Sequence, residues 1–247
     1  MPFLKKIAFN WNRNNREEMN RYPFNVPALQ GVNSLDMDHN VVFLIGENGT
    51  GKSTLLEALA CKCGFGLKGG SKNNLFEEDN HITQLASIMT VSWLPKVNNG
   101  FFMRAETFFD FAGYLDEMAK EEGEIMFQAY GGKSLNQQSH GEAFLSLFNN
   151  RFNSKGIYLL DEPEAALSPQ RQLAFLRIIW QLEHEGKAQF IIATHSPILM
   201  AYPDAVIYSF DKERVERVAY EETEHYQLTK AFLQNRETFF RELFVDS

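Results

Sequence analysis

Short apolar runs alternate with amphipathic segments along the chain, and this alternation predicts an α/β fold. The continuous apolar run VVFLI at 41–45 is typical of a parallel strand that is buried on both faces, and a helix-forming segment follows it at 52–63. The same pattern predicts strands at 4–9, 156–163, 188–197 and 205–210, helices at 169–186 and 224–244, and a strand end that leads into a helix at 101–122. We therefore expect a mostly parallel sheet with ligands at the carboxyl ends of its strands.

The segments between these elements are polar and predict connecting chain. The Asn- and Arg-rich run at 10–21 and the Gly-, Asn- and Lys-rich region at 64–80 are typical of loops. The stretch YPFNVPAL at 22–29 carries two prolines and predicts extended chain. We expect one compact domain over residues 1–247, with the phenylalanines of 101–122 in its core.

Composition and charge limit the classes of protein to which this sequence can belong. The 247 residues are 44% hydrophobic and 23% charged, which is typical of a globular protein. The net charge of −8 disfavours general attraction to nucleic acid, so nucleic-acid binding would need a local basic patch. Cys61 and Cys63 are too few for a disulfide framework and lack a nearby histidine pair for zinc, so we expect reduced thiols on one helix. No signal peptide and no run of about 18–20 apolar residues is present, and we expect a cytoplasmic protein.

The string GENGTGKS at 46–53 matches the phosphate-loop pattern G-x-x-x-x-G-K-[ST] in full. It lies between an apolar strand and a helix, where backbone amides and the helix N-terminus bind the β- and γ-phosphates of a nucleotide. Lys52 is expected to reach the same oxygens, and the Ser53 hydroxyl is expected to bind Mg²⁺. The expected phosphate-binding residues are Gly46, Asn48, Gly49, Thr50, Gly51, Lys52, Ser53 and Thr54.

The string GGKS at 131–134 looks like a second phosphate loop but fails the same template. Phe127 occupies the position of the first glycine, and no long apolar strand leads into the loop. We interpret GGKS as a flexible turn.

Two later strands end in polar residues that fit nucleotide hydrolysis. YLLDEP at 158–163 places Asp161 at the edge of the sheet to hold Mg²⁺, directly or through water, and Glu162 where it can act as general base on the attacking water. Taken alone, the same string also fits a strand followed by an acidic turn. IIATHSP at 191–197 places His195 at a strand end, where it can hydrogen-bond the γ-phosphate or the attacking water.

The string SHGE at 139–142 fits a capping box at the start of a helix. In this motif the serine and the glutamate satisfy backbone amides reciprocally. A helix N-terminus that presents amides and a hydroxyl is also an anion site. SHGE therefore predicts a helix start with a second place for phosphate.

These motifs, in this order, resemble the ATPase domain of the ATP-binding-cassette (ABC) superfamily. The forms GENGTGKST, LDEPEAALSP and ATHSPIL are more similar to its SMC-like and overcoming-lysogenisation-like branches than to transporter cassettes, and nearly the whole chain resembles small stand-alone bacterial predicted ATPases. The resemblance implies a P-loop NTPase fold of the ABC type. Such a head has a mostly parallel central sheet, an antiparallel N-terminal β part and a small helical sub-domain, here at about 64–152.

The resemblance also implies a head-to-tail homodimer that holds two ATP molecules, with Mg²⁺, at its interface. Ser139, Gly141 and Glu142 would then bind the ATP of the other subunit, and the stretch 165–168 would cross the interface. His140 and Glu142 depart from the usual Gly and Gln, and no leucine precedes Ser139. These departures concern how tightly the helix start at 139–142 would bind phosphate.

Several assignments stay open at the level of sequence. The resemblance also implies a glutamine loop, whose position falls on Glu106, within 104–106, or on Gln128, Gln137 or Gln138. Tyr22 and Phe24 are the candidates for stacking on the base of the nucleotide. We expect an ATPase that dimerises on ATP and couples hydrolysis to an unidentified partner process. The alternatives are a nucleic-acid-associated repair or phage-defence switch, the cytoplasmic cassette of a membrane transporter, and a P-loop kinase. The motif forms and the lack of a membrane segment disfavour the transporter.

Overall fold

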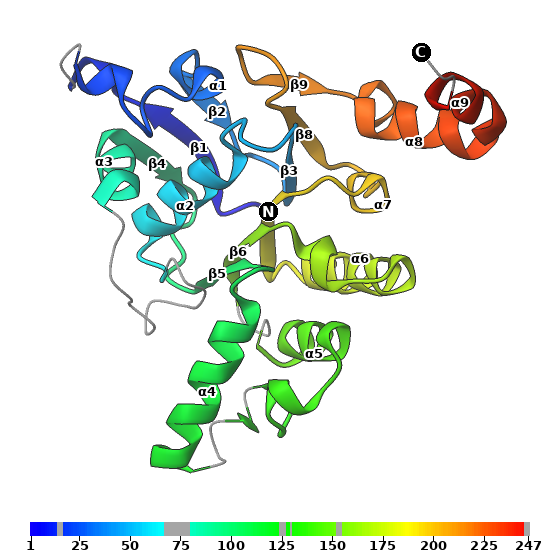
Figure 1. Cartoon of the computed structure of the whole chain (residues 1–247). Helices are drawn as coiled ribbons and strands as arrows, with labels where there is room; N and C mark the ends of the chain where they lie inside the picture. The colour runs from blue at the N-terminus through cyan, green and yellow to red at the C-terminus, as the bar shows by residue number, and fades with distance from the viewer. Residues whose placement is uncertain (14–16, 67–79, 124–126, 129, 152–154, 245–247) are drawn as a thin grey trace.

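Two β-sheets and the helices around them make up the protein in a computed structural model that describes residues 1–13, 17–66, 80–123, 127–128, 130–151 and 155–244 (Figure 1). The smaller sheet is antiparallel, with strand order β2-β1-β4, and the larger has the order β5-β6-β7-β3-β8-β9. In the larger sheet β5, β6, β7, β3 and β8 are parallel, and β9 is antiparallel to β8. This arrangement confirms the predicted α/β fold with a mostly parallel central sheet and an antiparallel N-terminal part.

The strands and helices are short and follow one another closely along the chain. The small sheet consists of β1 (Leu4–Phe9), β2 (Ser34–Asp36) and β4 (Met89–Trp93). The central sheet consists of β3 (Val41–Ile45), β5 (Gly100–Arg104), β6 (Gly156–Asp161), β7 (Ala188–Ala193), β8 (Val206–Ser209) and β9 (Glu216–Val218). The α-helices are α1 (Pro27–Gln30), α2 (Lys52–Cys63), α3 (Asn80–Ile88), α4 (Phe108–Glu122), α5 (His140–Arg151), α6 (Pro169–His184), α7 (Pro197–Met200), α8 (Glu224–Gln234) and α9 (Arg236–Leu243).

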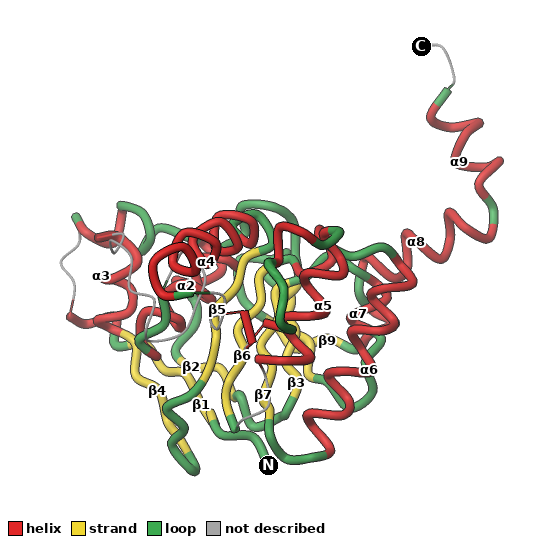
Figure 2. The backbone as a smooth tube through the Cα atoms, turned by 90° about the horizontal axis from the view of Figure 1, so that it is seen from below, coloured by secondary structure: helices red, strands yellow, loops and turns green. Residues whose placement is uncertain are grey.

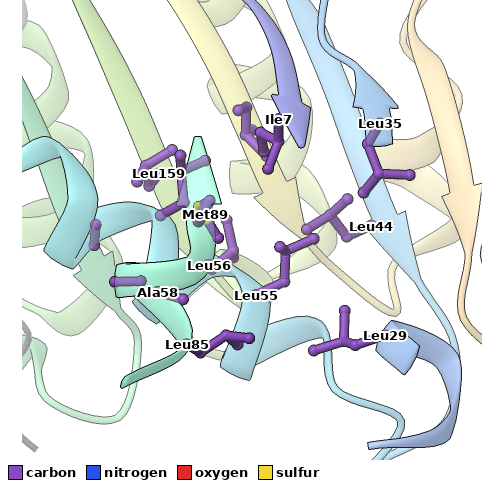
Figure 3. Close-up of a cluster of buried hydrophobic side chains, with 14 of the residues drawn as sticks. Ile7, Leu29, Leu35, Leu44, Leu55, Leu56, Ala58, Leu85, Met89 and Leu159 are labelled. Carbon is purple, nitrogen blue, oxygen red and sulfur yellow. The ribbon is translucent and has the colours of Figure 1, made fainter. Parts of the chain in front are cut away.

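Both faces of the central sheet are buried, which explains the unbroken apolar run of β3. Val42 and Leu44 point into a core shared with α2 and the small sheet, whereas Val41, Phe43 and Ile45 join a second core. Figure 3 shows the first core, in which Leu44 lies near the α2 leucines 55 and 56. Because β3 has packed elements on each side and no solvent face, every position of β3 is apolar.

Aromatic side chains fill the second core, beneath α4, α5 and α6. Phe144 lies 4.8 Å from Phe148 between ring centroids, and Phe148 lies 4.7 Å from Phe175. The described phenylalanine side chains of 101–122 are also buried, as predicted; they are Phe101, Phe102, Phe108 and Phe111. Of these helices, α4 and α5 lie between β5 and β6 in the chain and stand in the lower part of Figure 1, whereas α6 follows β6. The division of 64–152 as a helical sub-domain stays a prediction.

The structure differs from the sequence prediction in several local elements. Pro27 begins a helical turn after an extended Val26, because proline fits the first position of a helix, so 22–29 is not extended throughout. The helix predicted at 224–244 is two helices, and Asn235 between them has a non-helical backbone (φ −148°, ψ 59°). The strands β2, β4 and β9 and the helix α3 were not predicted. Most of the loop predicted at 64–80 falls on 67–79, outside the described residues.

Two smaller sequence predictions concern α2 and GGKS. Cys61 and Cys63 lie on α2, and Cys63 is buried. GGKS is a turn in which Gly131 and Gly132 have positive φ angles of 93° and 76°.

Within the described ranges, no helix combines the length and the apolar character that crossing a membrane requires.

The side chain of Gln189 on β7 joins the central sheet to the N-terminal strand. Its Oε1 accepts hydrogen bonds from the backbone N–H groups of Phe3 (2.9 Å) and Leu4 (2.7 Å). Its Nε2 donates to the carbonyl oxygens of Leu4 (2.9 Å), Met37 (2.6 Å) and His39 (3.0 Å). The side chain is fully buried, so one amide satisfies backbone groups that water does not reach.

Replacing Gln189 with leucine should destabilise the protein. We expect the free energy of unfolding to fall by about 3 kcal/mol, because buried polar groups that lose their partner cost about 1–3 kcal/mol each. Urea denaturation followed by circular dichroism measures this change. Gln181→Leu, on the exposed face of α6, is the matched control and should shift stability by less than about 0.5 kcal/mol. Equal losses in the two variants would contradict the role of Gln189.

Candidate functional site

The predicted phosphate loop connects β3 to the start of α2. Gly51, the residue before α2, has a left-handed backbone with φ 104°. A Cβ atom at Gly51 would lie 2.5 Å from Cγ1 of Val26, so a side chain there would also displace the segment before α1. Glycine at this position therefore allows both the turn and the close approach of 22–30 to the loop.

Lys52 is held inside the loop by the loop's own carbonyl groups. Its Nζ donates to the carbonyl oxygens of Gly46 (2.6 Å) and Glu47 (2.9 Å). Burial lowers the pKa of Lys52, while the nearby carboxylates of Glu162 and Asp161 act to raise it. A desolvated ammonium at the N-terminus of a helix favours an anionic group such as a polyphosphate as its partner.

Ser53 and Asp161 converge from the phosphate loop and from the end of β6. The Ser53 hydroxyl donates to Oδ1 of Asp161 at 3.1 Å, and Asp161 is 4% exposed. Burial raises the pKa of Asp161, whereas Arg104 and the Ser53 hydroxyl lower it. Oxygen donors of this kind fit Mg²⁺, which takes one or two protein ligands and completes its shell with phosphate and water.

Arg104, at the end of β5, is a site residue whose role the sequence did not reveal. It forms an ion pair with Glu57 of α2, and its Nε lies 3.4 Å from Oδ2 of Asp161. Its Nη2 lies 3.7 Å from Oε2 of Glu106. The available signal was an arginine directly after the apolar run FFM, since β5 is paired with β6 and places Arg104 opposite Asp161. The guanidinium therefore offsets the negative charge of the buried carboxylate.

Glu162 and His195 lie close together at the ends of β6 and β7. Glu162 has a left-handed backbone (φ 51°), and its Oε1 lies 3.5 Å from Nε2 of His195. The two strands pair so that Asp161 is opposite Ala193, and both chains turn away from the sheet just beyond this pair. The structure thus brings together the strand-end residues that the sequence placed separately.

Two residues that sequence reasoning missed, Glu164 and His225, also hold His195 in place, through its backbone N–H and its Nδ1. Its backbone N–H donates to Oε1 of Glu164 at 2.6 Å, and its Nδ1 lies 3.1 Å from Nε2 of His225 on α8. Burial and the charge of Lys52 lower the pKa of His195, although Glu162 acts to raise it, so the imidazole is neutral near pH 7. Glu164 belongs to the same DEPE string as Glu162, but no local pattern connects His225 to the site.

A cavity of about 520 Å³ opens over the phosphate loop and extends toward the segment before α1. Its wall includes Lys52, Ser53 and Glu162, together with Glu106. Among the glutamine-loop candidates, Glu106 therefore lines the cavity, whereas Gln137 and Gln138 lie at a 3₁₀ turn beside α5.

Of the two aromatic candidates for base stacking, Tyr22 faces the same cavity. It is 43% exposed and lines the wall, and its hydroxyl lies 3.3 Å from Oγ1 of Thr54. Phe24 is 3% exposed and belongs to the core. Only the Tyr22 ring, of these two, has a face available for a ligand.

Ser139, Gly141 and Glu142 stand at the start of α5, as the SHGE motif predicts. The backbone N–H of Ser139 donates to Oε2 of Glu142 at 3.1 Å, and hydrogen bonds from Ser139 lower the pKa of that carboxyl. Arg171 of α6 donates from Nη2 to the Ser139 hydroxyl at 3.2 Å and lies 3.6 Å from Oε1 of Glu142. A Cβ atom at Gly141 would lie 2.4 Å from Nη1 of Arg171, so glycine makes room for the guanidinium. Arg171 was not foreseen.

The start of α5 and the phosphate-loop cavity are separate within one chain. Among the described residues that line the cavity, none comes from SHGE. The predicted site residues therefore form two groups, one around Lys52, Asp161 and Glu162 and another around Ser139 and Gly141.

Comparisons with known proteins point to one kind of domain. A family model described as "AAA domain, putative AbiEii toxin, Type IV TA system" matches residues 148–201. The macrolide export ATP-binding/permease protein MacB of Bartonella henselae is 26% identical over 87% of this chain, but the chain covers only 36% of that protein. The zinc import ATP-binding protein ZnuC of Buchnera aphidicola subsp. Acyrthosiphon pisum is 26% identical over 69% of each chain.

A solved structure agrees with the sequence relatives. CbiO1 from Clostridium perfringens, part of the ABC transporter complex cbiONQ, superposes with a TM-score of 0.51 and 18% identity, covering 98% of this chain and 100% of that one. At this identity the match concerns the fold. Together with the motifs that the fold brings together, it confirms the resemblance found in the sequence: the chain has the fold of an ABC-type ATPase domain and carries the motifs of such domains in the same order.

Proposed function

We propose that this domain binds and hydrolyses ATP, and that it does so as a head-to-tail homodimer that closes on ATP and opens after hydrolysis. The observation that carries the proposal is the separation of the two groups of site residues. The cavity at Lys52 offers binding and hydrolytic residues, while the hydroxyl and amides at Ser139 lie outside it. A second copy related by a two-fold axis would place each group opposite the other.

The residues of the cavity suit the binding and cleavage of a nucleoside triphosphate. The loop amides and Lys52 hold the β- and γ-phosphates, and Ser53 with Asp161 would hold Mg²⁺, which neutralises phosphate charge. Glu162 orients the attacking water and accepts its proton. Neutral His195, 3.5 Å from that carboxylate, donates from Nε2 toward the γ-phosphate.

Replacing Tyr22 with alanine should weaken binding of the nucleotide base. Stacking on an aromatic ring contributes about 1–3 kcal/mol, so we expect the Kd for ATP to rise about tenfold or more. Tyr22→Phe keeps the ring and should stay within about twofold of wild type. Isothermal titration calorimetry with ATP and with inorganic triphosphate separates the contribution of the base to binding from that of the phosphates, because triphosphate has no base to stack. An equal loss for both ligands would contradict the stacking role.

Replacing Glu162 with glutamine should stop hydrolysis while ATP still binds. We expect kcat to fall by a factor of about 10²–10⁴, the usual contribution of a positioned general base. Light scattering with ATP and Mg²⁺ should then detect a dimer that wild type forms only transiently. Asp110→Asn, an exposed carboxylate on α4, serves as the control and should hydrolyse ATP normally. A Glu162→Gln protein with wild-type turnover would refute the assignment of the base.

Mixing two inactive variants tests whether Ser139 acts on the other subunit. Lys52→Ala damages the phosphate loop and Ser139→Arg blocks the start of α5, so each homodimer lacks an intact site. A mixed dimer would pair the undamaged loop of one chain with the undamaged helix of the other. Random pairing at equal amounts should restore about a quarter of the wild-type ATPase rate. Activity that stays at the level of the separate variants would mean that Ser139 does not act in trans.

Among the processes that this ATPase could serve, the similar proteins favour transport, with the domain as a transporter cassette. MacB and ZnuC are named as ATP-binding proteins of export and import, and CbiO1 is part of an ABC transporter complex. The motif forms of this chain are closer to the SMC-like branch, and its net charge of −8 gives little general attraction to DNA. Co-purification of the Glu162→Gln form with an integral-membrane subunit would favour the transporter role, and salt-sensitive, ATP-dependent retention on DNA would favour the nucleic-acid switch.

A further inference from the structure

A second histidine lies directly behind the strand-end histidine of the site. Nε2 of His225 is 3.1 Å from Nδ1 of His195, and the two rings are 5.3 Å apart between centroids. The opposite nitrogen of His195, Nε2, faces Oε1 of Glu162 at 3.5 Å. His195 therefore has one ring nitrogen toward the hydrolytic carboxylate and the other toward α8.

The first turn of α8, which carries His225, is fixed to the body of the protein. Thr223 is 2% exposed and caps the helix by accepting from the backbone N–H of Tyr226 at 3.3 Å. The Tyr220 hydroxyl donates to the carbonyl oxygen of Pro197 at 2.9 Å, just beyond His195. His225 is thus held in a defined position relative to the loop that follows β7.

The contact between two neutral imidazoles requires one proton between the facing nitrogens. If His195 supplied that proton from Nδ1, its Nε2 would have no hydrogen and could not donate toward phosphate. If His225 supplies it from Nε2, His195 accepts at Nδ1 and carries its own hydrogen on Nε2. In that second arrangement Nδ1 of His225 is a bare acceptor. In either arrangement one of the two outer nitrogens, Nε2 of His195 or Nδ1 of His225, is a buried N–H and the other is a bare acceptor, and neither atom has a hydrogen-bond partner within the described chain. The carboxylate oxygen Oε1 of Glu162, which can only accept, lies 3.5 Å from Nε2 of His195 and favours the arrangement with the hydrogen on that nitrogen.

We propose that His225 is a positioning residue that holds His195 in the tautomer with its hydrogen on Nε2. The inference rests on the proposed ATPase function, in which that hydrogen points toward the γ-phosphate. The lowered pKa of His195, caused mainly by burial, keeps the ring neutral, so the tautomer decides which nitrogen donates. A hydrogen bond to the far nitrogen is the usual way in which a protein sets the tautomer of a working histidine.

This role connects the site to the C-terminal helices. His225 belongs to α8, which continues through Asn235 into α9, and Figure 2 shows this pair extending away from the rest of the protein. A displacement of the first turn of α8 large enough to break the 3.1 Å contact would remove the donor behind His195. The position of α8 thereby affects the hydrolytic step without touching the nucleotide.

The experiment compares His225→Leu, which has no donor, with His225→Gln, whose amide nitrogen can take the place of Nε2. We expect leucine to lower kcat for ATP about 10- to 100-fold, with KM nearly unchanged. This is the usual loss of activity when a working histidine loses the hydrogen-bond partner of its far nitrogen. Glutamine should restore most of the lost rate. The control His184→Leu, an exposed histidine on α6, should have wild-type kcat. Thermal unfolding of each variant shows whether it is folded.

Nitrogen-15 NMR of the imidazoles gives a measurement that does not depend on turnover. In wild type we expect His195 as the tautomer protonated at Nε2 and His225 also protonated at Nε2. A His195 protonated at Nδ1 would overturn the inference, as would a folded leucine variant with unchanged kcat or a glutamine variant as slow as leucine. If wild type failed to hydrolyse ATP, the proposed function would fall, while the spectrum would still decide the tautomer.

Discussion

Parallel pairing of the central strands is the constraint on which the rest of the structure depends. The register places Arg104, Asp161, Ala193 and Leu44 in one row across β5, β6, β7 and β3. Each strand ends at or just after this row, so the phosphate loop, Glu162 and His195 emerge at the same edge of the sheet. Parallel strands share one direction, and their carboxyl ends must meet. The site is a direct consequence of that direction.

Two of the charged side chains at this edge, Asp161 and Lys52, are buried, at 4% exposure each. Asp161 is buried between Arg104, Ser53 and Lys52, and Lys52 is held by loop carbonyl groups. Buried charges are tolerated only when partners compensate the loss of hydration. Glu162, by contrast, faces the cavity, where it remains available to water and substrate. The protein thus holds its binding groups in place and leaves the proposed base accessible.

Two regions far apart in sequence complete the site from outside the sheet edge. Arg171 of α6 reaches the Ser139 hydroxyl, and His225 of α8 reaches the ring of His195. Both contacts depend on helix packing. They connect the start of α5 to α6, the helix that follows β6, and they connect the strand-end histidine to the C-terminal helices. The start of α5 and the strand-end histidine are therefore both positioned by contacts between segments distant in the sequence.

The sequence by itself determined strands β3, β6, β7 and β8 of the central sheet, α2, α6 and the phosphate loop, because periodicity and the GENGTGKS spacing are local properties. It also predicted that Asp161, Glu162 and His195 lie at strand ends, since apolar runs stop there. It did not reveal β2 or β9, whose three residues carry too little pattern, nor the break at Asn235.

The tertiary structure alone decided which side chains meet. Arg104 opposite Asp161, Tyr22 rather than Phe24 at the cavity, and His225 behind His195 all follow from the pairing of segments distant in the chain. The physical reason is that burial and contact are set by how whole faces pack, whereas a sequence pattern records only the period of one segment.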